Sequence, residues 1–409
     1  MKISTKITHK FDFGLFLPML ALIVIGLFAI KSATYNHPYA SGNFNKQLFF
    51  AFISLGIFFA IYFMPHRFLR FFALPSYGFT ILLLLAVLVI GKSTYGAKSW
   101  ISLGPVGFQP SEIGKIGLIL ALSYWLGKAN VALDNVKDFS VAVALAFLPL
   151  VLILAQPDMG TAIIYMIVTI SLFFWAGIDL FGLFVLLSPP LLVFISFFGV
   201  WASVLAVAAI IGVLFYFKKD LFTSITVFVI NISSIFLFEV GLKFLKPHQQ
   251  KRILSFLNPS ADPLGSGYNA IQASVAVGSG GLFGKGYMHG SQTQLRFIPE
   301  QWTDFIFSVI GEEFGFIGSA LVVILFSIIF YRLLRIAIKS KDNFSSLTVI
   351  GILTVLLMHF FINIGMNIGL APVVGIPLPF MSYGGTALIV NVAMIAIAMN
   401  IFANNKEHA

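Results

Sequence analysis

The sequence predicts an all-α, polytopic integral membrane protein. Of its 409 residues, 59% are hydrophobic and only 10% are charged, and the mean hydropathy is +0.99. A soluble globular domain carries about 25% charged residues, so this composition excludes a soluble enzyme and a disordered chain. The chain has no cysteine, which excludes disulfides, thiol chemistry and metal sites of the Cys type.

Apolar runs of about 20 residues, the length that crosses a bilayer as a helix, recur along the chain. Short polar breaks with helix-breaking residues, such as Gln156-Pro157-Asp158, separate neighbouring runs. We therefore expect about twelve transmembrane helices. The runs are 12–33, 46–64, 72–91, 111–127, 139–156, 159–177, 181–198, 200–217, 222–243, 304–333, 346–368 and 380–402.

The distribution of basic residues predicts the orientation. Twelve crossings place both termini on one side, and most Lys and Arg residues of the short loops fall on that side, which is therefore cytoplasmic. The short loops of the other side carry only Lys31, Lys46, Lys92 and Lys98. Orientation explains the net charge of +10, so we expect no nucleic-acid partner. One long loop, 244–303, is then extracytoplasmic.

Acidic residues are few, and many of them fall near the predicted outer face. Ionisable groups at membrane depth are costly, so those that are present are candidates for function. None has His or Cys neighbours at metal-ligand spacing, so we expect no built-in metal site. These outer acids are Glu112, Asp158, Glu239, Asp262, Glu300, Asp304, Glu312 and Glu313.

Two of the candidates lie where spans begin. Glu112 and Lys115 are three residues apart, so they share one helix face. They could form a local structural ion pair, or Lys115 could reach an anion or a carboxylate of the outer loop. Asp158 could act in the site or simply cap the helix that follows it.

The long outer loop and the start of the last span hold the other candidates. Asp262 precedes a proline, so it could form a turn or serve as a general base. The glycine-rich run 278–286, with Lys285, could cradle a phosphate or form tight turns. The stretch 377–386 has glycines that would allow close helix packing or an irregular backbone facing outward.

Together these stretches resemble the SEDS family (shape, elongation, division and sporulation) of peptidoglycan polymerases. The matching motifs are FQPSEIGKI at 108–116, QPDMGTA at 156–162, NPSADPLGSGYNAIQASVAVGSGGLFGKG at 258–286, PEQWTDFIFSVIGEEFG at 299–315 and GIPLPFMSYGGTA at 375–387. They follow the family's order, and the resemblance covers nearly the whole chain as a single domain, 1–409.

Within the family, GKGYMHGSQTQLRFIPE at 284–300 and NIGMNIGLAPVVG at 363–375 resemble the RodA-like elongation branch. Family members usually have ten spans, so the resemblance implies that 200–243 is an inserted helical hairpin. Trp302 departs from the family pattern, in which a His is usual before Thr-Asp.

The resemblance implies a glycosyltransferase that polymerises lipid II, the undecaprenyl-pyrophosphate-linked disaccharide-pentapeptide, with inversion. Asp262 matches the family's loop Asp and would be the general base. Glu112 and Lys115 would orient or tune it, and Lys285 and Arg296 would bind the diphosphate. The remaining expected supporting residues are Asp158, Glu300, Thr303, Asp304 and Ser382.

The same resemblance implies partners and a location. A class B penicillin-binding protein would be the transpeptidase partner, together with the elongation machinery. No cofactor is expected, although a divalent cation, Mg²⁺ or Mn²⁺, could accompany the lipid pyrophosphate. The protein would lie in the bacterial inner membrane with its active site on the extracytoplasmic side.

Three alternatives remain open at this point: a lipid II flippase, a division-specific (FtsW-like) polymerase, and a purely structural scaffold. A flippase needs a polar path across the bilayer, whereas the acids here cluster near the two faces. An inverted repeat of the kind common in secondary transporters is not evident in the sequence.

Overall fold

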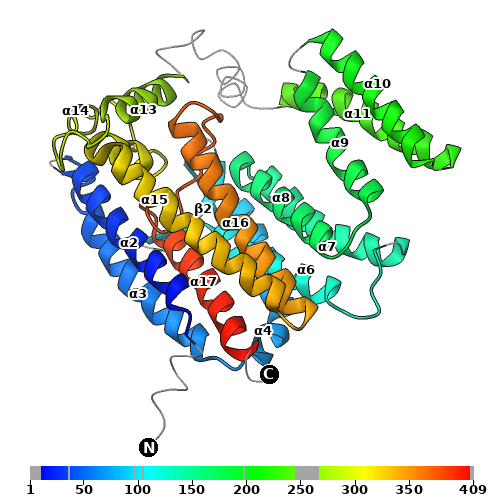
Figure 1. Ribbon diagram of the computed structural model, residues 1–409, viewed down its shortest axis with the longest axis horizontal. Helices are drawn as coiled ribbons and strands as arrows, with labels where there is room; N and C mark the ends of the chain where they lie inside the picture. The colour runs from blue at the N-terminus through cyan, green and yellow to red at the C-terminus, as the bar shows by residue number, and fades with distance from the viewer. Residues whose placement is uncertain are drawn as a thin grey trace, which may run out of the picture. The chain divides into compact units, whose positions relative to one another are not determined.

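The computed structural model describes residues 11–35, 37–94, 97–103, 106–133, 135–196, 199–218, 220–244 and 267–405. The chain divides into two compact units, Met1–Ala176 with Ser255–Ala409 (unit 1) and Gly177–Leu254 (unit 2). Each unit is nearly all helical over its described residues, as expected (Figure 1). Asp262 lies outside the described residues.

Every predicted apolar run coincides with a helix of the structure. Among the described residues, eight helices (α2, α3, α5, α7, α10, α15, α16 and α17) are long and apolar enough to cross a membrane, so the count of twelve spans stays a prediction. The long helices of unit 1 are α2 (Phe13–Thr34), α3 (Asn43–Phe63), α5 (Ala73–Ile90), α6 (Pro110–Leu126), α7 (Val136–Ala155), α8 (Met159–Trp175), α15 (Ile306–Lys339), α16 (Asn343–Asn367) and α17 (Gly385–Asn405).

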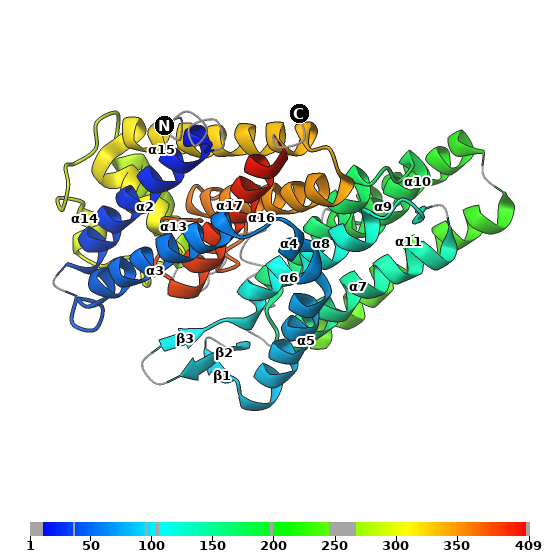
Figure 2. The same cartoon turned by 90° about the horizontal axis from the view of Figure 1, so that it is seen from below.

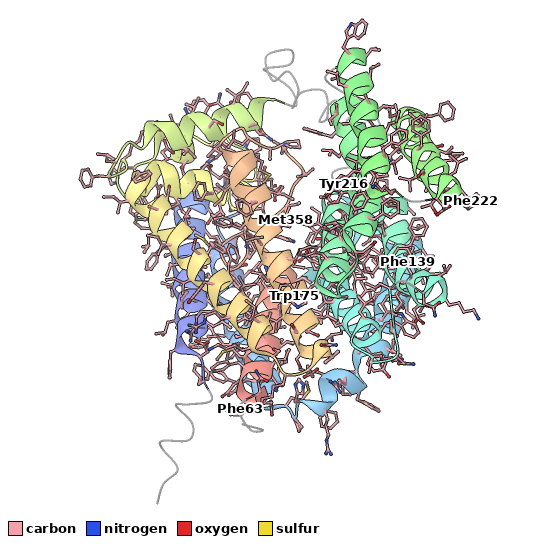
Figure 3. The ribbon with its side chains drawn as sticks, turned by 45° about the vertical axis from the view of Figure 1, so that its right-hand side comes forward. Phe63, Phe139, Trp175, Tyr216, Phe222 and Met358 are labelled. Carbon is pink, nitrogen blue, oxygen red and sulfur yellow. The ribbon has the colours of Figure 1, made fainter. Side chains whose placement is uncertain are left out.

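Helices α16 and α17 form the interior of unit 1. They are the most buried of the eight candidate spans, and α6, α8 and α15 pack on α16 while α3 packs on α17. Small residues on α6 allow close approach, because a Cβ at Gly114 would collide with the Tyr165 hydroxyl of α8. Trp175 of α8, labelled in Figure 3, donates from Nε1 to Ser346 Oγ of α16 at 2.8 Å.

The helix ends of unit 1 gather in two places. We call the one where α2 and α16 begin the termini end. We call the other, where α6, α8 and α15 begin and α16 ends, the site end. At the termini end, Arg332 binds Asp12, which precedes α2, and Arg70 binds Asp342, which precedes α16. The short helix α4 (Arg67–Phe71) also lies there. In Figure 1, α2 begins and α17 ends at this end. Polar residues expected in the cytoplasm therefore meet at one end.

The polar stretch 92–110 forms a three-stranded antiparallel sheet, which an all-α prediction did not include. Its strands are β1 (Lys92–Thr94), β2 (Ala97–Leu103) and β3 (Val106–Phe108), in the order β1-β2-β3. Ile101 pairs with Phe108 and Leu103 with Val106. β-branched and aromatic residues favour strands, and Gly104-Pro105 in the sequence between β2 and β3 is typical of a turn. Figure 2 shows the sheet beside α5.

The described part of the predicted outer loop contains two helices, α13 (Tyr268–Ser279) and α14 (Ser291–Gln294). α13 packs on α15, and the segment between the two short helices docks on a break in α15 at Gly315. Gly315 has φ +64°, a backbone conformation that favours glycine. The Lys285 and Gly286 amides donate to the Glu312 and Glu313 carbonyls at 3.0 Å, which replaces helical hydrogen bonds at the break.

Unit 2 contains α9 (Leu180–Ser196), α10 (Val200–Phe217) and α11 (Leu221–Phe244). The predicted hairpin 200–243 spans α10 and α11, and its origin as an insertion stays a prediction. Asn231 of α11 donates to Ser188 Oγ of α9 at 3.0 Å, a polar link of the kind that joins apolar helices. Its small core consists of Phe181, Leu192, Ile210, Leu214 and Val227.

Candidate active site

A buried cation with two partners lies at the start of α6. Lys115 Nζ donates to Glu112 Oε1 at 2.7 Å, so the predicted i,i+3 ion pair is confirmed. Lys115 Nζ also lies 3.0 Å from Nε2 of His359, which comes from α16. All three residues are at most 4% exposed. A buried charge is tolerated only with partners of this kind, and both partners contact the ammonium directly.

The same part of α6 retains unused hydrogen-bonding capacity. Within the described part of the chain, Glu112 Oε2 and Ser111 Oγ are buried and have no hydrogen-bond partner. Buried polar atoms are nearly always paired in folded proteins. Unpaired atoms next to a fixed charge are what a site for a polar ligand would leave when the ligand is absent.

Asp158 lies beside this cluster and caps α8. Its carboxylate accepts from the Thr161 amide at 3.1 Å and from the Thr161 hydroxyl at 2.9 Å. Gln109, which precedes α6, donates at 2.8 Å to Asp158 Oδ2, the oxygen that also accepts from the Thr161 hydroxyl. The capping interpretation is confirmed, and the cap joins α8 to the start of α6.

The segment 368–384, which connects α16 to α17, has no regular secondary structure and joins the parts of the site. We call it the connecting segment. His359 Nδ1 lies 3.2 Å from the Pro377 carbonyl, and Asn363 Nδ2 donates to the Ile376 carbonyl at 2.8 Å. Asn363 and Asn367 also donate to the Asp304 carbonyl, at 2.9 and 3.1 Å.

His359, Asn363 and Asn367 are spaced by four residues and therefore lie on one face of α16. We call them the α16 stripe. Through the stripe, α16 contacts Lys115 of α6, the carbonyls of Ile376 and Pro377 in the connecting segment, and the Asp304 carbonyl just before α15. The sequence prediction treated 346–368 as a plain apolar span and missed these residues, although their i, i+4, i+8 spacing was available as a signal.

Ser382 and Thr303 meet across the same segment. Ser382 Oγ donates to the Thr303 carbonyl at 2.6 Å and accepts from the Leu378 amide at 2.8 Å. Gln47 of α3, also missed by the sequence prediction, donates to the Ser382 carbonyl and accepts from the Gly384 amide at 3.0 Å. These bonds fix the fold of the connecting segment.

Charged and aromatic residues form a rim near Trp302. His37 lies edge-on to Trp302 with ring centroids 4.8 Å apart. Burial and the neighbouring Arg296 lower the pKa of His37, whereas burial and Glu300 raise the pKa of Tyr383. Arg296 and Glu300 both have positive φ, 61° and 53°, and backbone strain of this kind is frequent at functional sites.

Lys285 lies in a separate cluster around Glu312. Its Nζ donates to Glu312 Oε1 at 2.8 Å, and the Gln292 amide donates to the same oxygen at 2.8 Å. The Thr293 amide and hydroxyl donate to the other oxygen at 2.9 and 2.7 Å. The glycine-rich run thus packs on α15, and Lys285 is 30% exposed.

The described candidates therefore form three groups: the buried group at α6, the group around the connecting segment, and the Lys285–Glu312 cluster. Asp262, the predicted base, lies outside the described residues, so its distance from Lys115 stays a prediction. Among the described residues, no three His, Asp or Glu side chains gather as metal ligands.

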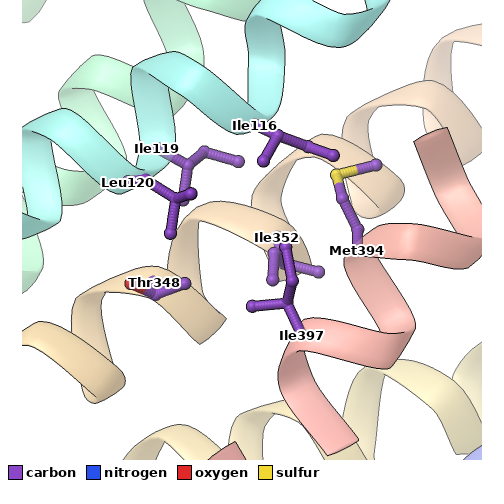
Figure 4. Close-up of a pocket in the computed structure, with 7 residues that line it drawn as sticks. All are labelled: Ile116, Ile119, Leu120, Thr348, Ile352, Met394 and Ile397. Atoms are coloured by element: carbon purple, nitrogen blue, oxygen red, sulfur yellow. The ribbon is translucent and has the colours of Figure 1, made fainter. Parts of the chain in front are cut away.

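A small apolar pocket lies between α6, α16 and α17 (Figure 4). The lone hydroxyl in its lining, Thr348 Oγ1, donates to the Phe344 carbonyl of its own helix. The pocket therefore belongs to helix packing and offers nothing to a polar substrate. Its lining residues are Ile116, Ile119, Leu120, Thr348, Ile352, Met394 and Ile397.

Comparison with known proteins extends over the whole chain. The family described as cell cycle protein, which comprises FtsW, RodA and SpoVE, matches residues 13–202 and 199–407. The peptidoglycan glycosyltransferase MrdB of Escherichia coli K12 is 38% identical and covers 81% of this chain and 77% of its own. The peptidoglycan glycosyltransferase RodA of Treponema pallidum is 35% identical, covering 97% and 98%.

Solved structures agree with these matches. A chain from a structure described as a peptidoglycan synthase complex that coordinates polymerization and crosslinking has a TM-score of 0.73 and 27% identity, covering 97% of this chain and 98% of its own. The rod shape determining protein RodA of Thermus thermophilus has a TM-score of 0.64 and 25% identity, covering 97% of each chain. The chain therefore belongs to the FtsW/RodA/SpoVE family, the SEDS family of membrane proteins.

Proposed function

We propose that this protein is a peptidoglycan glycosyltransferase of the elongation type that polymerises lipid II. The observation that carries the proposal is its relation to enzymes of that name over nearly its full length. The RodA and MrdB relatives, at 35% and 38% identity, favour the elongation role over the division role, whose FtsW relatives are 31–33% identical.

In the proposed reaction, the 4-hydroxyl of a GlcNAc unit attacks the anomeric carbon of MurNAc. The new C–O bond forms as the bond to the lipid pyrophosphate breaks, and the hydroxyl proton passes to a carboxylate base. An α-linked donor then gives a β-1,4 linkage by inversion. Asp262 is the proposed base, and Lys115 would stabilise the ionised Asp262 carboxylate or orient it.

The buried group at α6 supports this assignment. A cation that is fixed by Glu112 and His359 in a water-poor site interacts strongly with a nearby anion, because few solvent dipoles screen it. That anion is the Asp262 carboxylate in our proposal. Arg296 and Lys285 are proposed to bind the diphosphate, with Lys285 sharing its charge with Glu312.

A divalent cation, Mg²⁺ or Mn²⁺, would enter with the diphosphate of the substrate. The described residues do not fit a resident metal, since no three ligand side chains gather among them. The chemistry of a diphosphate leaving group would still benefit from a cation that the substrate carries in.

We also propose the orientation and the partner. Unit 1 gathers its basic loops at the termini end, which supports placing both termini in the cytoplasm and the site end outside. In this arrangement α8 ends at the cytoplasmic face, so the three helices of unit 2 return the chain to the outer face and give twelve crossings. The peptidoglycan synthase complex among the similar structures supports a class B penicillin-binding protein as transpeptidase partner.

The test uses purified full-length protein in detergent or nanodiscs, with and without the transpeptidase partner, and fluorescent lipid II. The expected product is polymerised glycan that a muramidase such as lysozyme digests. Transport of lipid II across sealed vesicles, with no glycan formed even when the partner is present, would overturn the polymerase and favour a flippase.

A further inference from the structure

The contact between Lys115 and His359 joins two helices that are far apart in the sequence. Lys115 lies on α6 and His359 on α16, and the two nitrogen atoms are 3.0 Å apart. His359 is 2% exposed and sits in an otherwise apolar stretch of α16. Buried histidines commonly form hydrogen bonds with neutral groups, whereas the partner of His359 Nε2 is the charged Lys115 ammonium.

The partners of the imidazole determine its tautomer. The Pro377 carbonyl, 3.2 Å from Nδ1, can only accept a hydrogen bond, so Nδ1 carries the proton. The Lys115 ammonium can only donate, so Nε2 must be the unprotonated acceptor. The geometry therefore requires a neutral His359 with its proton on Nδ1.

This arrangement sets the direction of the ammonium. Glu112 Oε1 at 2.7 Å and His359 Nε2 at 3.0 Å accept two of its three protons. Within the described part of the chain, the third N–H has no hydrogen-bond partner. Two acceptors on different helices determine where that third N–H points, whereas Glu112 alone would leave the lysine able to rotate.

The imidazole also transmits the position of the connecting segment. Pro377 is one residue from Leu378, whose amide donates to Ser382 Oγ, and Ser382 in turn donates to the Thr303 carbonyl. A shift of this segment would therefore move His359 and, through it, Lys115. Glu112 has no such link, because it shares a helix with Lys115.

We propose that His359 is a positioning residue for the reaction: its neutral imidazole, anchored on the Pro377 carbonyl, aims the Lys115 ammonium at the reacting groups. The proposal rests on the proposed function, because it needs Lys115 to act in polymerisation. His359 itself touches neither substrate nor base in this account.

The test compares His359→Gln with His359→Leu. A glutamine side chain carries an acceptor and a donor at its tip with a separation similar to that of the two ring nitrogens, so it can accept from Lys115 and donate to Pro377. Leucine has a similar volume and offers neither. Thr348→Val is the matched control, since Thr348 is buried in the same helix and bonds only its own backbone.

Initial rates of glycan formation are measured against lipid II concentration, and the melting temperature of each variant is measured in parallel. We expect H359L to lose about 100-fold in kcat, because a small misplacement of a catalytic group costs about that much. Its KM should change little, H359Q should recover most of kcat, and T348V should match the wild type.

A kcat for H359L within a few-fold of the wild type would overturn the proposal, as would equal losses in H359Q and H359L. If H359L does not fold, His359→Phe, which keeps a flat ring without nitrogen, takes its place in the comparison with H359Q.

Lys115→Met separates this proposal from the proposed function. Absence of glycan from the wild type itself would refute the polymerase. Full activity of K115M would refute the role of Lys115, and with it the proposed role of His359. Loss of activity in K115M together with full activity of H359L would refute the positioning role alone.

Discussion

Polar side chains at the two ends of unit 1 bind different groups. At the termini end, Asn400 Nδ2 donates to the carbonyls of Ile61, Tyr62 and Met64, where α3 ends. Asp342 caps α16 through the Ser345 amide and hydroxyl. These side chains complete the hydrogen bonding of helix ends, a structural task.

At the site end, by contrast, polar side chains hold a charged group and an irregular segment. Lys115 lies between Glu112 and His359, and Asn363 and Gln47 donate hydrogen bonds to backbone carbonyls of the connecting segment. Among the buried polar atoms that have no partner within the described residues, Glu112 Oε2 and Ser111 Oγ lie at the start of α6, beside the Lys115 ammonium. The polar side chains at the termini end therefore stabilise the fold, whereas those at the site end keep polar groups available for a ligand at some cost in stability.

The largest effect is expected at the site end. Lys115→Met leaves the buried Glu112 carboxylate without its cation, which should lower the free energy of unfolding by about 3–5 kcal/mol. Glycan formation should also be lost. Melting curves and lipid II polymerisation measure the two effects separately.

The double variant Glu112→Leu with Lys115→Met tests the same pair further. Replacing both charges with apolar groups should return most of the lost stability, because no unpaired charge remains buried. Activity should stay absent. Recovery of activity in the double variant would show that the pair is structural, as at the termini end.

Next in size is Asn400→Leu at the termini end. Three partly buried carbonyls at the end of α3 lose their donor, so we expect a loss of about 2–3 kcal/mol in the free energy of unfolding. Activity per folded molecule should match the wild type at a temperature below the transition. A selective loss of activity in folded protein would break the division between the two ends.

Gln47→Leu sharpens the comparison, because Gln47 binds backbone, as Asn400 does, but at the site end. Removing its bonds to Ser382 and Gly384 should cost about 1–2 kcal/mol. It should also lower kcat several-fold, since the connecting segment that carries Pro377 would shift. Steady-state kinetics on the folded variant provide the measurement, and an unchanged kcat would confine Gln47 to stability.

The smallest effect concerns pH at the termini end. Burial lowers the pKa of His66 below its ordinary value of 6.5, against the opposing effect of Asp342. His66 of the unfolded chain then binds a proton at a higher pH than His66 of the folded protein. The contribution of neutral His66 to the free energy of unfolding is therefore fully present above pH 6.5 and decreases as the pH falls through the lowered pKa. His66→Gln should reduce the difference between melting temperatures at pH 7.5 and 5.5, and an unchanged difference would contradict this assignment.

Much of the fold could be predicted from the sequence because long apolar runs define membrane helices. The run 304–333, for example, corresponds to α15, whose break at Gly315 could not be predicted. That break depends on the amides of Lys285 and Gly286, which lie about thirty residues away in the sequence. The sheet at 92–108 was missed because its strands are short, two of them only three residues long, and polar and apolar residues are mixed in them.

The site was predictable only where neighbours in sequence are neighbours in space. Glu112 and Lys115 are one helical turn apart, and Asp158 directly precedes α8, which it caps. Both the ion pair and the cap could therefore be predicted from sequence spacing. The contacts of Lys115 with His359 and of Ser382 with Thr303 join residues 244 and 79 positions apart. Tertiary packing alone brings such pairs together.

The role of Asp262 as the general base is tested by comparing Asp262→Asn with Asp304→Asn in lipid II polymerisation, with the transpeptidase partner present. We expect glycan from the wild type, none from folded D262N, and substantial product from D304N, because the substitution keeps the Asp304 backbone carbonyl that Asn363 and Asn367 bind. Equal polymerisation by the wild type and D262N would contradict this role and move the search for the base to Glu300 and Asp304.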